Sequence, residues 1–167
     1  MGLDITAYRT AVFERAMRSD EDPDTLGNAF RFIYTVPAFA AQADGMQSGF
    51  YRVPSGDAVH AFPAGSYSGY NHWREWLCRL VHAVAPSTLW HDTTGKYAGA
   101  AFFELINFAD NEGVIGPKTS AKLAKDFAEW QDRADAAGAE ARGYLGLFND
   151  FRKAFKLAAG NGCVKFH

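Results

Sequence analysis

The residues whose types suit chemistry best stand in one unbroken run, Gly-Ser-Tyr-Ser-Gly-Tyr-Asn-His-Trp-Arg, from Gly65 to Arg74. Its serine, tyrosine and asparagine side chains can donate and accept short-range hydrogen bonds, and its rings offer faces for stacking. Its arginine is a planar cation that suits a carboxylate or a phosphate. Backbone N–H groups at the start of a helix would also favour an anion. The run therefore predicts a ligand site made of Ser66, Tyr67, Ser68, Tyr70, Asn71, Trp73 and Arg74.

The same run has a simpler structural interpretation, in which it is a glycine-rich turn that leads from a strand into a helix. Ser68 or Asn71 would then cap the helix by accepting a backbone hydrogen bond. Trp73 would anchor the turn and Arg74 would be exposed. We favour the ligand site, because capping needs fewer polar groups than the run contains.

A second polar segment, from Asn107 to Gly116, contains the carboxylates of Asp110 and Glu112. Carboxylates two residues apart can bind a divalent cation or act as acid and base. Acidic residues ahead of a helix also offset its dipole without any catalytic role. We assign Asn107, Asp110 and Glu112 to the ligand site on the condition that this segment meets the Gly65–Arg74 run in space.

The familiar catalytic and cofactor motifs are incomplete in this chain. Residues 113–120 resemble a phosphate-binding loop, but only two residues separate the glycines where the Walker motif has four, and Pro117 lacks an N–H. His91-Asp92-Thr93 matches half of the two-histidine phosphodiesterase signature, and no second triplet occurs. The two cysteines, Cys78 and Cys163, form no CxxC pair and are predicted to be free thiols. We therefore expect neither a metal nor another cofactor.

Composition narrows the class of partner. The chain has 167 residues and a formal net charge of −2, so there is no general attraction to nucleic acid or to anionic lipid, and we expect neither as a partner. No apolar run reaches the length that crosses a membrane, and no secretory signal opens the chain. Together with the predicted free thiols, these features favour a location in the cytoplasm.

Hydrophobic periodicity predicts the elements that must position these loops. Alternating or β-branched stretches predict strands at Leu3–Tyr8, Phe30–Val36, Gly49–Val53 paired in a hairpin with Ala58–Phe62, and Cys163–His167. Apolar residues three and four apart predict helices at Arg9–Arg18, from Tyr70 to Pro86, at Gly99–Phe108, from Pro117 onward, and at Ala139–Ala159. The order predicts one α+β domain over residues 1–167, in which three or four helices cover a small, mostly antiparallel sheet.

Helical spacing also predicts where particular side chains point. Trp73 shares an apolar face with Leu77 and should pack inward, so that Arg74 turns toward Asp110 and Glu112. On the helix that begins at Pro117, we expect five charged side chains to face water: Lys118, Lys122, Lys125, Asp126 and Glu129. The acidic run at residues 19–24 is expected to be a solvated surface loop.

Three motifs resemble a family of small uncharacterised proteins of phages and prophages. They are Met-Gly-Leu-Asp-Ile at residues 1–5, the run at 65–74, and Phe-Glu-Leu-Ile-Asn-Phe at 103–108 with its continuation through Asp110, Glu112-Gly113, 115–117 and 120–127. The resemblance spans most of the chain. It implies a protein of the bacterial cytoplasm and brings no assigned activity. Similar sequences often read Ser-Asp-Cys-Glu-Gly where this chain has Ala-Asp-Asn-Glu-Gly at 109–113, so the thiol of that pattern is missing here.

These features together predict a binding protein. The expected target is a small polar or anionic ligand, such as a nucleotide, or a host protein docked over the same aromatic and polar surface. For a phage-borne protein, the resemblance implies a role in countering a host defence. The alternative is a hydrolase or transferase acting on a nucleotide-like substrate, with Asp110 or Glu112 as general base or metal ligand and Arg74 holding the anion. A structural component of the virion is a third interpretation, although no extended arm or repeat supports it.

Overall fold

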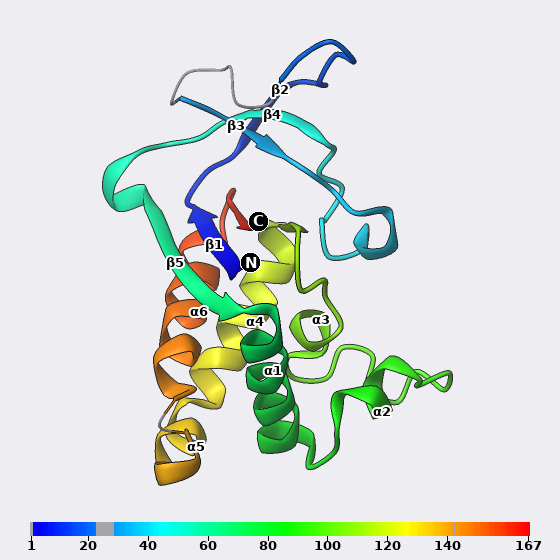
Figure 1. Ribbon diagram of the computed structural model, residues 1–167, viewed down its shortest axis with the longest axis vertical. Coiled ribbons are helices and arrows are strands. Elements are labelled where there is room, and N and C mark those ends of the chain that lie inside the picture. The colour runs from blue at the N-terminus through cyan, green and yellow to red at the C-terminus, as the bar shows by residue number, and fades with distance from the viewer. Residues whose placement is uncertain (1, 23–28, 142) are drawn as a thin grey trace.

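The computed structural model (Figure 1) describes residues 2–22, 29–141 and 143–167 and contains two antiparallel sheets. The four-stranded sheet has the order β5-β1-β7-β6, with β1 at Gly2–Tyr8, β5 at Val59–Ser66, β6 at Gly113–Ile115 and β7 at Cys163–Phe166. The three-stranded sheet has the order β2-β4-β3, with β2 at Val12–Arg15, β3 at Phe30–Ile33 and β4 at Gly49–Arg52. The α+β class with antiparallel strands is confirmed, although the strands form two sheets and not the single sheet expected.

The helices gather on one side of the four-stranded sheet, and the three-stranded sheet lies beyond the other side (Figure 1). Their bounds are α1 Tyr67–His82, α2 Pro86–Trp90, α3 Phe103–Ile106, α4 Pro117–Glu129, α5 Gln131–Ala136 and α6 Leu145–Ala158. Short 3-10 turns occupy Pro37–Phe39, Gly56–Ala58 and Gly138–Ala141. Helix α6 packs against α4 and against β1, β5 and β7, so it lies directly on the four-stranded sheet.

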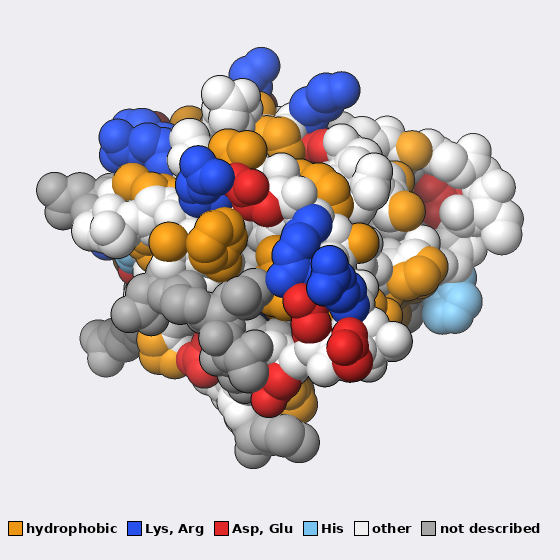
Figure 2. All heavy atoms as spheres, turned by 90° about the horizontal axis from the view of Figure 1, so that it is seen from above, with side chains coloured by type: hydrophobic (Ala, Val, Ile, Leu, Met, Phe, Trp, Pro, Cys, Tyr) orange, Lys and Arg blue, Asp and Glu red, His pale blue; other side chains and the backbone are white. Residues whose placement is uncertain are grey.

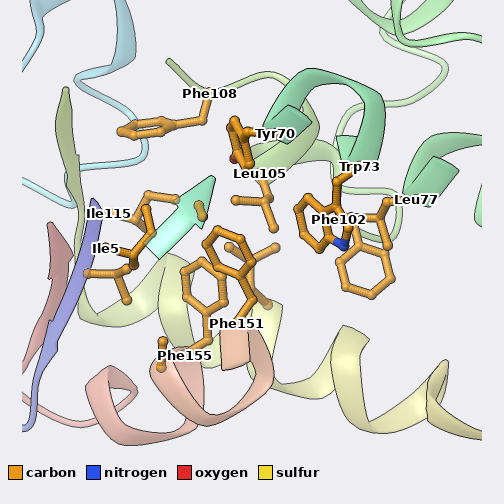
Figure 3. Packing of buried hydrophobic residues seen from close by; sticks show 14 of the residues in the cluster. Ile5, Tyr70, Trp73, Leu77, Phe102, Leu105, Phe108, Ile115, Phe151 and Phe155 are labelled. Carbon is orange, nitrogen blue, oxygen red and sulfur yellow. The ribbon is translucent and has the colours of Figure 1, made fainter. Parts of the chain in front are cut away.

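The large core lies between the four-stranded sheet and the helices, and aromatic rings fill it (Figure 3). Phe151 of α6 stacks on Trp73 of α1 at 4.8 Å between ring centroids and meets Phe62 of β5 edge-on at 5.1 Å. Trp73 is 0% exposed, and its indole N–H donates to the carbonyl of Tyr144 at 3.2 Å. The prediction that Trp73 packs inward is confirmed.

A second, smaller core lies between the two sheets. It consists of Tyr8, Ile33, Ala43, Tyr51, Val53, Val114 and Cys163. Strand alternation explains it, because successive side chains of β1 and β7 point to opposite faces of the sheet. Seen from above, the three-stranded end of the molecule mixes hydrophobic, basic and acidic side chains over its surface (Figure 2).

Both cysteines are free, as predicted, and both are buried. Burial raises the pKa of the Cys78 thiol to about 11 and that of Cys163 to about 12. A thiol held in its protonated form is a poor nucleophile. Both side chains therefore serve packing in the described structure.

Two predictions about the first third of the chain are wrong. Residues 9–18 do not form a helix, because Val12–Arg15 pairs with β4 and the ring of Phe13 packs edge-on against Tyr51 at 5.3 Å. The expected hairpin is also absent from the described residues, since β4 pairs with β2 and β3 whereas β5 pairs with β1. In both cases the pairing between strands, and not the local sequence pattern, determines the structure.

Smaller differences concern the ends of elements. The 99–108 segment is mostly turns around the short α3, and the last helix begins at Leu145 rather than near residue 139. Helix α4 begins at Pro117, as predicted. The last strand is also confirmed, and it lies between β1 and β6 rather than at an edge. In the acidic run, Glu21 pairs with Arg15 at 2.6 Å, and residues 23–24 lie outside the described residues.

Candidate functional site

The start of α1 uses the serines of the Gly65–Arg74 run for capping. Ser66 is the N-cap and accepts a hydrogen bond from the Gly69 N–H at 3.1 Å, so the cap is neither Ser68 nor Asn71. The hydroxyl of the exposed Ser68 lies 3.1 Å from that of Ser66. Tyr67 is half-buried and packs against the large core. The first part of the run therefore makes a helix start.

Arg74 joins α1 to the segment that follows α3. It is only 5% exposed, and its Nη1 donates to the carbonyls of Phe108 at 2.5 Å and Ile106 at 3.3 Å. Its Nη2 donates to Asn71 Oδ1 and lies 3.9 Å from the Asp110 carboxylate, to which Asn71 Nδ2 donates at 2.8 Å. The prediction that Arg74 turns toward Asp110 and Glu112 is confirmed for Asp110 and not for Glu112, which lines a hollow elsewhere, and the two sequence motifs lie together. We call this contact, of Tyr70–Arg74 with residues 100–110, the α1–α3 junction.

Aromatic rings close the junction around the guanidinium. Its carbon lies 5.1 Å from the Tyr70 ring centroid and 5.7 Å from that of Trp90, distances typical of cation–π contacts. Trp90 also donates its N–H to the Ile106 carbonyl at 3.1 Å. Tyr70 is fully buried, and burial raises the pKa of its phenol well above the usual value. Tyr70 and Trp73 are thus core residues, and neither ring offers a free face to a ligand.

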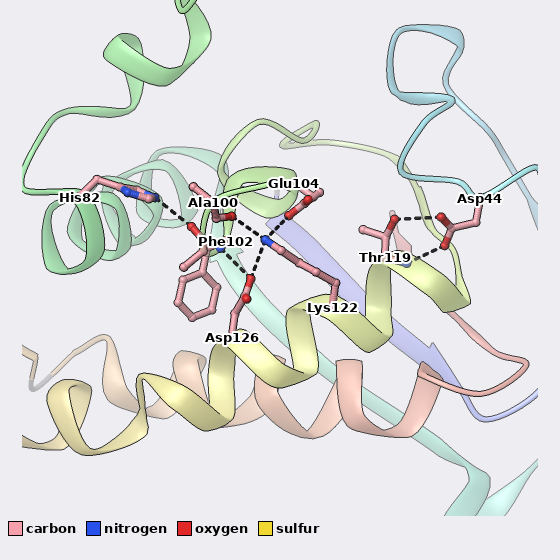
Figure 4. Close-up of polar contacts among 9 residues, drawn as sticks. Asp44, His82, Ala100, Phe102, Glu104, Thr119, Lys122 and Asp126 are labelled. Carbon is pink, nitrogen blue, oxygen red and sulfur yellow. Dashed lines mark hydrogen bonds and ion pairs between the residues drawn. The ribbon is translucent and has the colours of Figure 1, made fainter. Parts of the chain in front are cut away.

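A second cation, Lys122, contacts the first part of the 100–110 segment (Figure 4). Lys122 Nζ donates to the Ala100 carbonyl at 2.5 Å and pairs with Glu104 at 2.6 Å and Asp126 at 2.8 Å. Asp126 also accepts the Phe102 N–H at 2.8 Å. The expectation that Lys122 and Asp126 face water is therefore wrong, because the irregular segment before α3 needs side-chain partners for its backbone.

The remaining predicted site residues, Asn107 and Glu112, take no part in the hydrogen bonds that join α1 to Ile106, Phe108 and Asp110 in the described structure. Asn107 is half-buried at the end of α3, where its N–H donates to the Phe103 carbonyl at 3.0 Å. Asp110 contacts α1, whereas Glu112 is exposed and lines a different hollow. The two carboxylates thus contact different surroundings. A shared role for Asp110 and Glu112 in catalysis stays a prediction.

The hollow that Glu112 lines is one of two neighbouring hollows whose walls include residues of both sheets. The larger, of about 540 Å³, is lined by Thr6, Tyr8, Arg31, Val53, Pro54, Ser55, Gly56, Val59, Ala61, Lys165 and His167. The smaller, of about 310 Å³, is lined by Phe32, Tyr34, Glu112, Lys165, Phe166 and His167. They adjoin because Lys165 and His167 belong to the walls of both. We call the two together the inter-sheet groove, and Figure 1 shows the two sheets between which it lies.

Charge and hydrogen bonding in the groove involve groups from three strands. Burial raises the pKa of the Tyr8 phenol, and the neighbouring Arg31 guanidinium opposes that rise. His167 Nε2 lies 2.9 Å from the Thr6 hydroxyl. Burial, and then the charge of Lys165, lower the pKa of His167. The imidazole is therefore mostly neutral at neutral pH, and an anion bound beside it would favour its protonated form.

The sequence indicated only part of this groove. Alternation along residues 163–167 puts Lys165 and His167 on one face of a strand, which could have been read directly. Arg31 and Tyr8 join them through the packing of one sheet over the other, and no local pattern shows that contact. Glu112 was predicted as a site residue, although the residues that line its hollow are not those expected.

A third hollow, of about 380 Å³, lies beside α1 and is lined by Glu75, Trp76, Arg79 and neighbouring side chains. There Glu75 and Arg79 pair with each other at 2.8 Å, so the charges of this hollow are matched within the helix. Among the described residues, no three His, Cys, Asp or Glu side chains stand close enough to hold a metal ion. Over the same part of the chain, no helix is both long and apolar enough to cross a bilayer. No protein-family model, curated protein or solved structure matches the chain.

Proposed function

We propose that this protein binds a small anionic ligand in the inter-sheet groove. The observation that supports the proposal is the convergence of Arg31, Lys165 and His167 on one hollow of about 540 Å³. Guanidinium and ammonium groups are the side chains that bind phosphate and carboxylate. The apolar remainder of the wall, which includes Val53 and Val59, would exclude water and strengthen these contacts. The volume falls in the usual range for ligand sites, about 300–1,000 Å³.

The alternative place for the anion, the α1–α3 junction, is less suitable. Arg74 is only 5% exposed and donates to two backbone carbonyls and to Asn71, so a ligand would have to displace buried contacts. Arg31 also donates to a backbone carbonyl, that of Phe30, but it borders the larger hollow of the groove. A buried guanidinium that loses its partners is costly. The junction contacts support a positioning role for Arg74, and the cations of the groove support binding.

The resemblance to phage and prophage proteins suggests the setting in which such binding would act. In a bacterial host, a protein that holds a small anion could withdraw a signal on which a defence depends. A host protein docked on this surface, and a hydrolase or transferase reaction, both stay predictions, because the contacts described above favour neither.

The test is anion binding by the full chain, measured by isothermal titration calorimetry at low ionic strength with inorganic phosphate and pyrophosphate. Lys165→Met keeps the aliphatic stem and removes the charge, so we expect at least a tenfold loss of affinity. Lys118→Met, at an exposed position of α4, is the matched control and should bind as the wild type does. Equal affinity of Lys165→Met and wild type, or no anion binding by the wild type, would overturn the proposal.

A further inference from the structure

We infer that the anion of the groove belongs to a nucleotide, whose base occupies the smaller hollow with Glu112 as the residue that selects it. The inference rests on the proposed anion site and adds the identity of the ligand class. It begins from the shared wall of the two hollows, since Lys165 and His167 line both. A ligand that reaches across these two residues can place unlike groups in the two hollows.

The smaller hollow has the walls that a flat ring requires. Phe32 and Tyr34, at and just after β3, contribute aromatic side chains to it. The Phe32 ring is fixed by an edge-on contact with Phe50 at 5.6 Å. Tyr34 remains 38% exposed, so part of its ring is open to solvent beside the hollow. Exposed aromatic faces beside a hollow are the surfaces on which nucleic acid bases stack.

Glu112 gives this hollow an acceptor at one end. It immediately precedes β6, whose register with β7 pairs Gly113 with Phe166 and so brings Glu112 beside His167. Its carboxylate takes part in none of the hydrogen bonds or ion pairs found among the described residues. A carboxylate accepts hydrogen bonds and repels phosphate. The base must therefore face Glu112, and the phosphate must lie toward Arg31 and Lys165.

The chemistry of a carboxylate then ranks the bases. Guanine presents two adjacent N–H donors, from its ring N1 and its amino group, and both can reach one carboxylate. Adenine and cytosine present an amino group beside an acceptor, so they make one such bond. Uracil presents a single N–H between two carbonyl oxygens, which a carboxylate repels. The geometry therefore favours guanine nucleotides most and uracil nucleotides least.

The experiment titrates the full chain with GMP, AMP, CMP and UMP, and with inorganic phosphate as the probe of the anion site alone. We expect GMP to bind at least tenfold more tightly than both UMP and phosphate. Glu112→Gln should weaken GMP binding at least tenfold and should not weaken phosphate binding, because the carboxylate repels phosphate. Tyr34→Ala should weaken all four nucleotides and leave phosphate unchanged. Glu129→Gln, at an exposed position of α4, is the matched control for the removal of a carboxylate.

The possible outcomes test the base site and the anion site separately. If all four nucleotides bind no more tightly than phosphate, the base site is wrong and the anion site stands. If GMP binds tightly but Glu112→Gln has no effect, the role of Glu112 is wrong. If phosphate binding does not depend on Lys165, the proposed function itself fails. Tyr34→Ala and Glu112→Gln both change exposed side chains, and an unchanged melting temperature of each variant would show that its fold is intact.

Discussion

The α1–α3 junction and the inter-sheet groove both contain cationic and aromatic side chains, but Arg74 of the junction is buried, whereas Arg31 and Lys165 of the groove border a hollow. At the junction, Arg74 is enclosed by Tyr70 and Trp90 and donates to carbonyls of the chain. In the groove, Arg31 and Lys165 line a space of about 540 Å³. The difference shows that a dense polar motif in a sequence can supply hydrogen bonds to the protein's own backbone as well as to a ligand.

The backbone of residues 100–110 explains why the junction needs so many donors. This segment contains one short helix, α3, so several of its carbonyls have no partner within regular secondary structure. Side chains supply the donors: Lys122 to Ala100, Trp90 to Ile106, and Arg74 to Ile106 and Phe108. The unusual composition of the two motifs therefore has a structural cause, which is the fixing of an irregular segment between two helices.

The largest expected effect tests the core side of the junction. Trp73→Ala should lower the free energy of unfolding by about 3–5 kcal/mol, the range for removal of a large buried aromatic side chain. The reason is the loss of its stacking on Phe151 and of its hydrogen bond to Tyr144. Urea unfolding followed by circular dichroism measures the change. Trp90→Ala, at a side chain 49% exposed, should cost much less, and an equal cost for the two would contradict the burial described here.

The next effect separates the two regions directly. Arg74→Ala leaves the Phe108 carbonyl without its donor, and a buried unpaired group costs ~1–3 kcal/mol. It also removes the hydrogen bond to Asn71 and one of the two donors of the Ile106 carbonyl, which keeps the N–H of Trp90. We expect a loss on the order of 3 kcal/mol in stability and, for the protein that remains folded, unchanged binding of phosphate. Arg79→Ala, on the exposed face of α1, should change stability by no more than about 0.5 kcal/mol. An Arg74→Ala protein of normal stability that no longer binds phosphate would move the ligand site back to the junction.

Local pattern predicted those elements whose periodicity and ends are both clear. The first and last strands alternate without interruption, and Pro117 marks the start of α4. The prediction for Val12–Arg15 was wrong because its apolar residues also fit helical spacing, and only the pairing with β4 makes it a strand. The division of β4 and β5 between two sheets was beyond local pattern for the same reason.

The candidate site shows the same division between local and long-range information. The meeting of Arg74 with Asp110 was predictable, since the packing of Trp73 inward leaves Arg74 few other directions. The inter-sheet groove was not, because its walls come from strands far apart in the sequence. Whether a cation on a strand lines a groove can be told only when the strand that faces it is known.

The smallest expected effect concerns pH and tests the groove alone. Burial first, and then the charge of Lys165, lower the pKa of His167 below the ordinary 6.5, while Asp4 opposes the change. The unfolded chain therefore binds a proton at a higher pH than the folded protein does. By linkage, the free energy of unfolding is fully maintained above pH 6.5 and falls as the pH drops through the folded pKa. This loss of stability should be smaller than the losses expected for Trp73→Ala and Arg74→Ala, since part of the His167 ring remains in solvent.

Urea midpoints at pH 7.5 and 5.5 measure this effect, with His167→Gln as the comparison because glutamine is polar and does not titrate. The wild type should lose more stability than His167→Gln between the two pH values. Sulfate, whose charge is constant over this range, should reduce the loss in the wild type, because an anion in the groove favours the protonated imidazole. It should have no such pH-dependent effect on His167→Gln. Identical pH dependence of the two proteins, with and without sulfate, would show that His167 does not face the anion site.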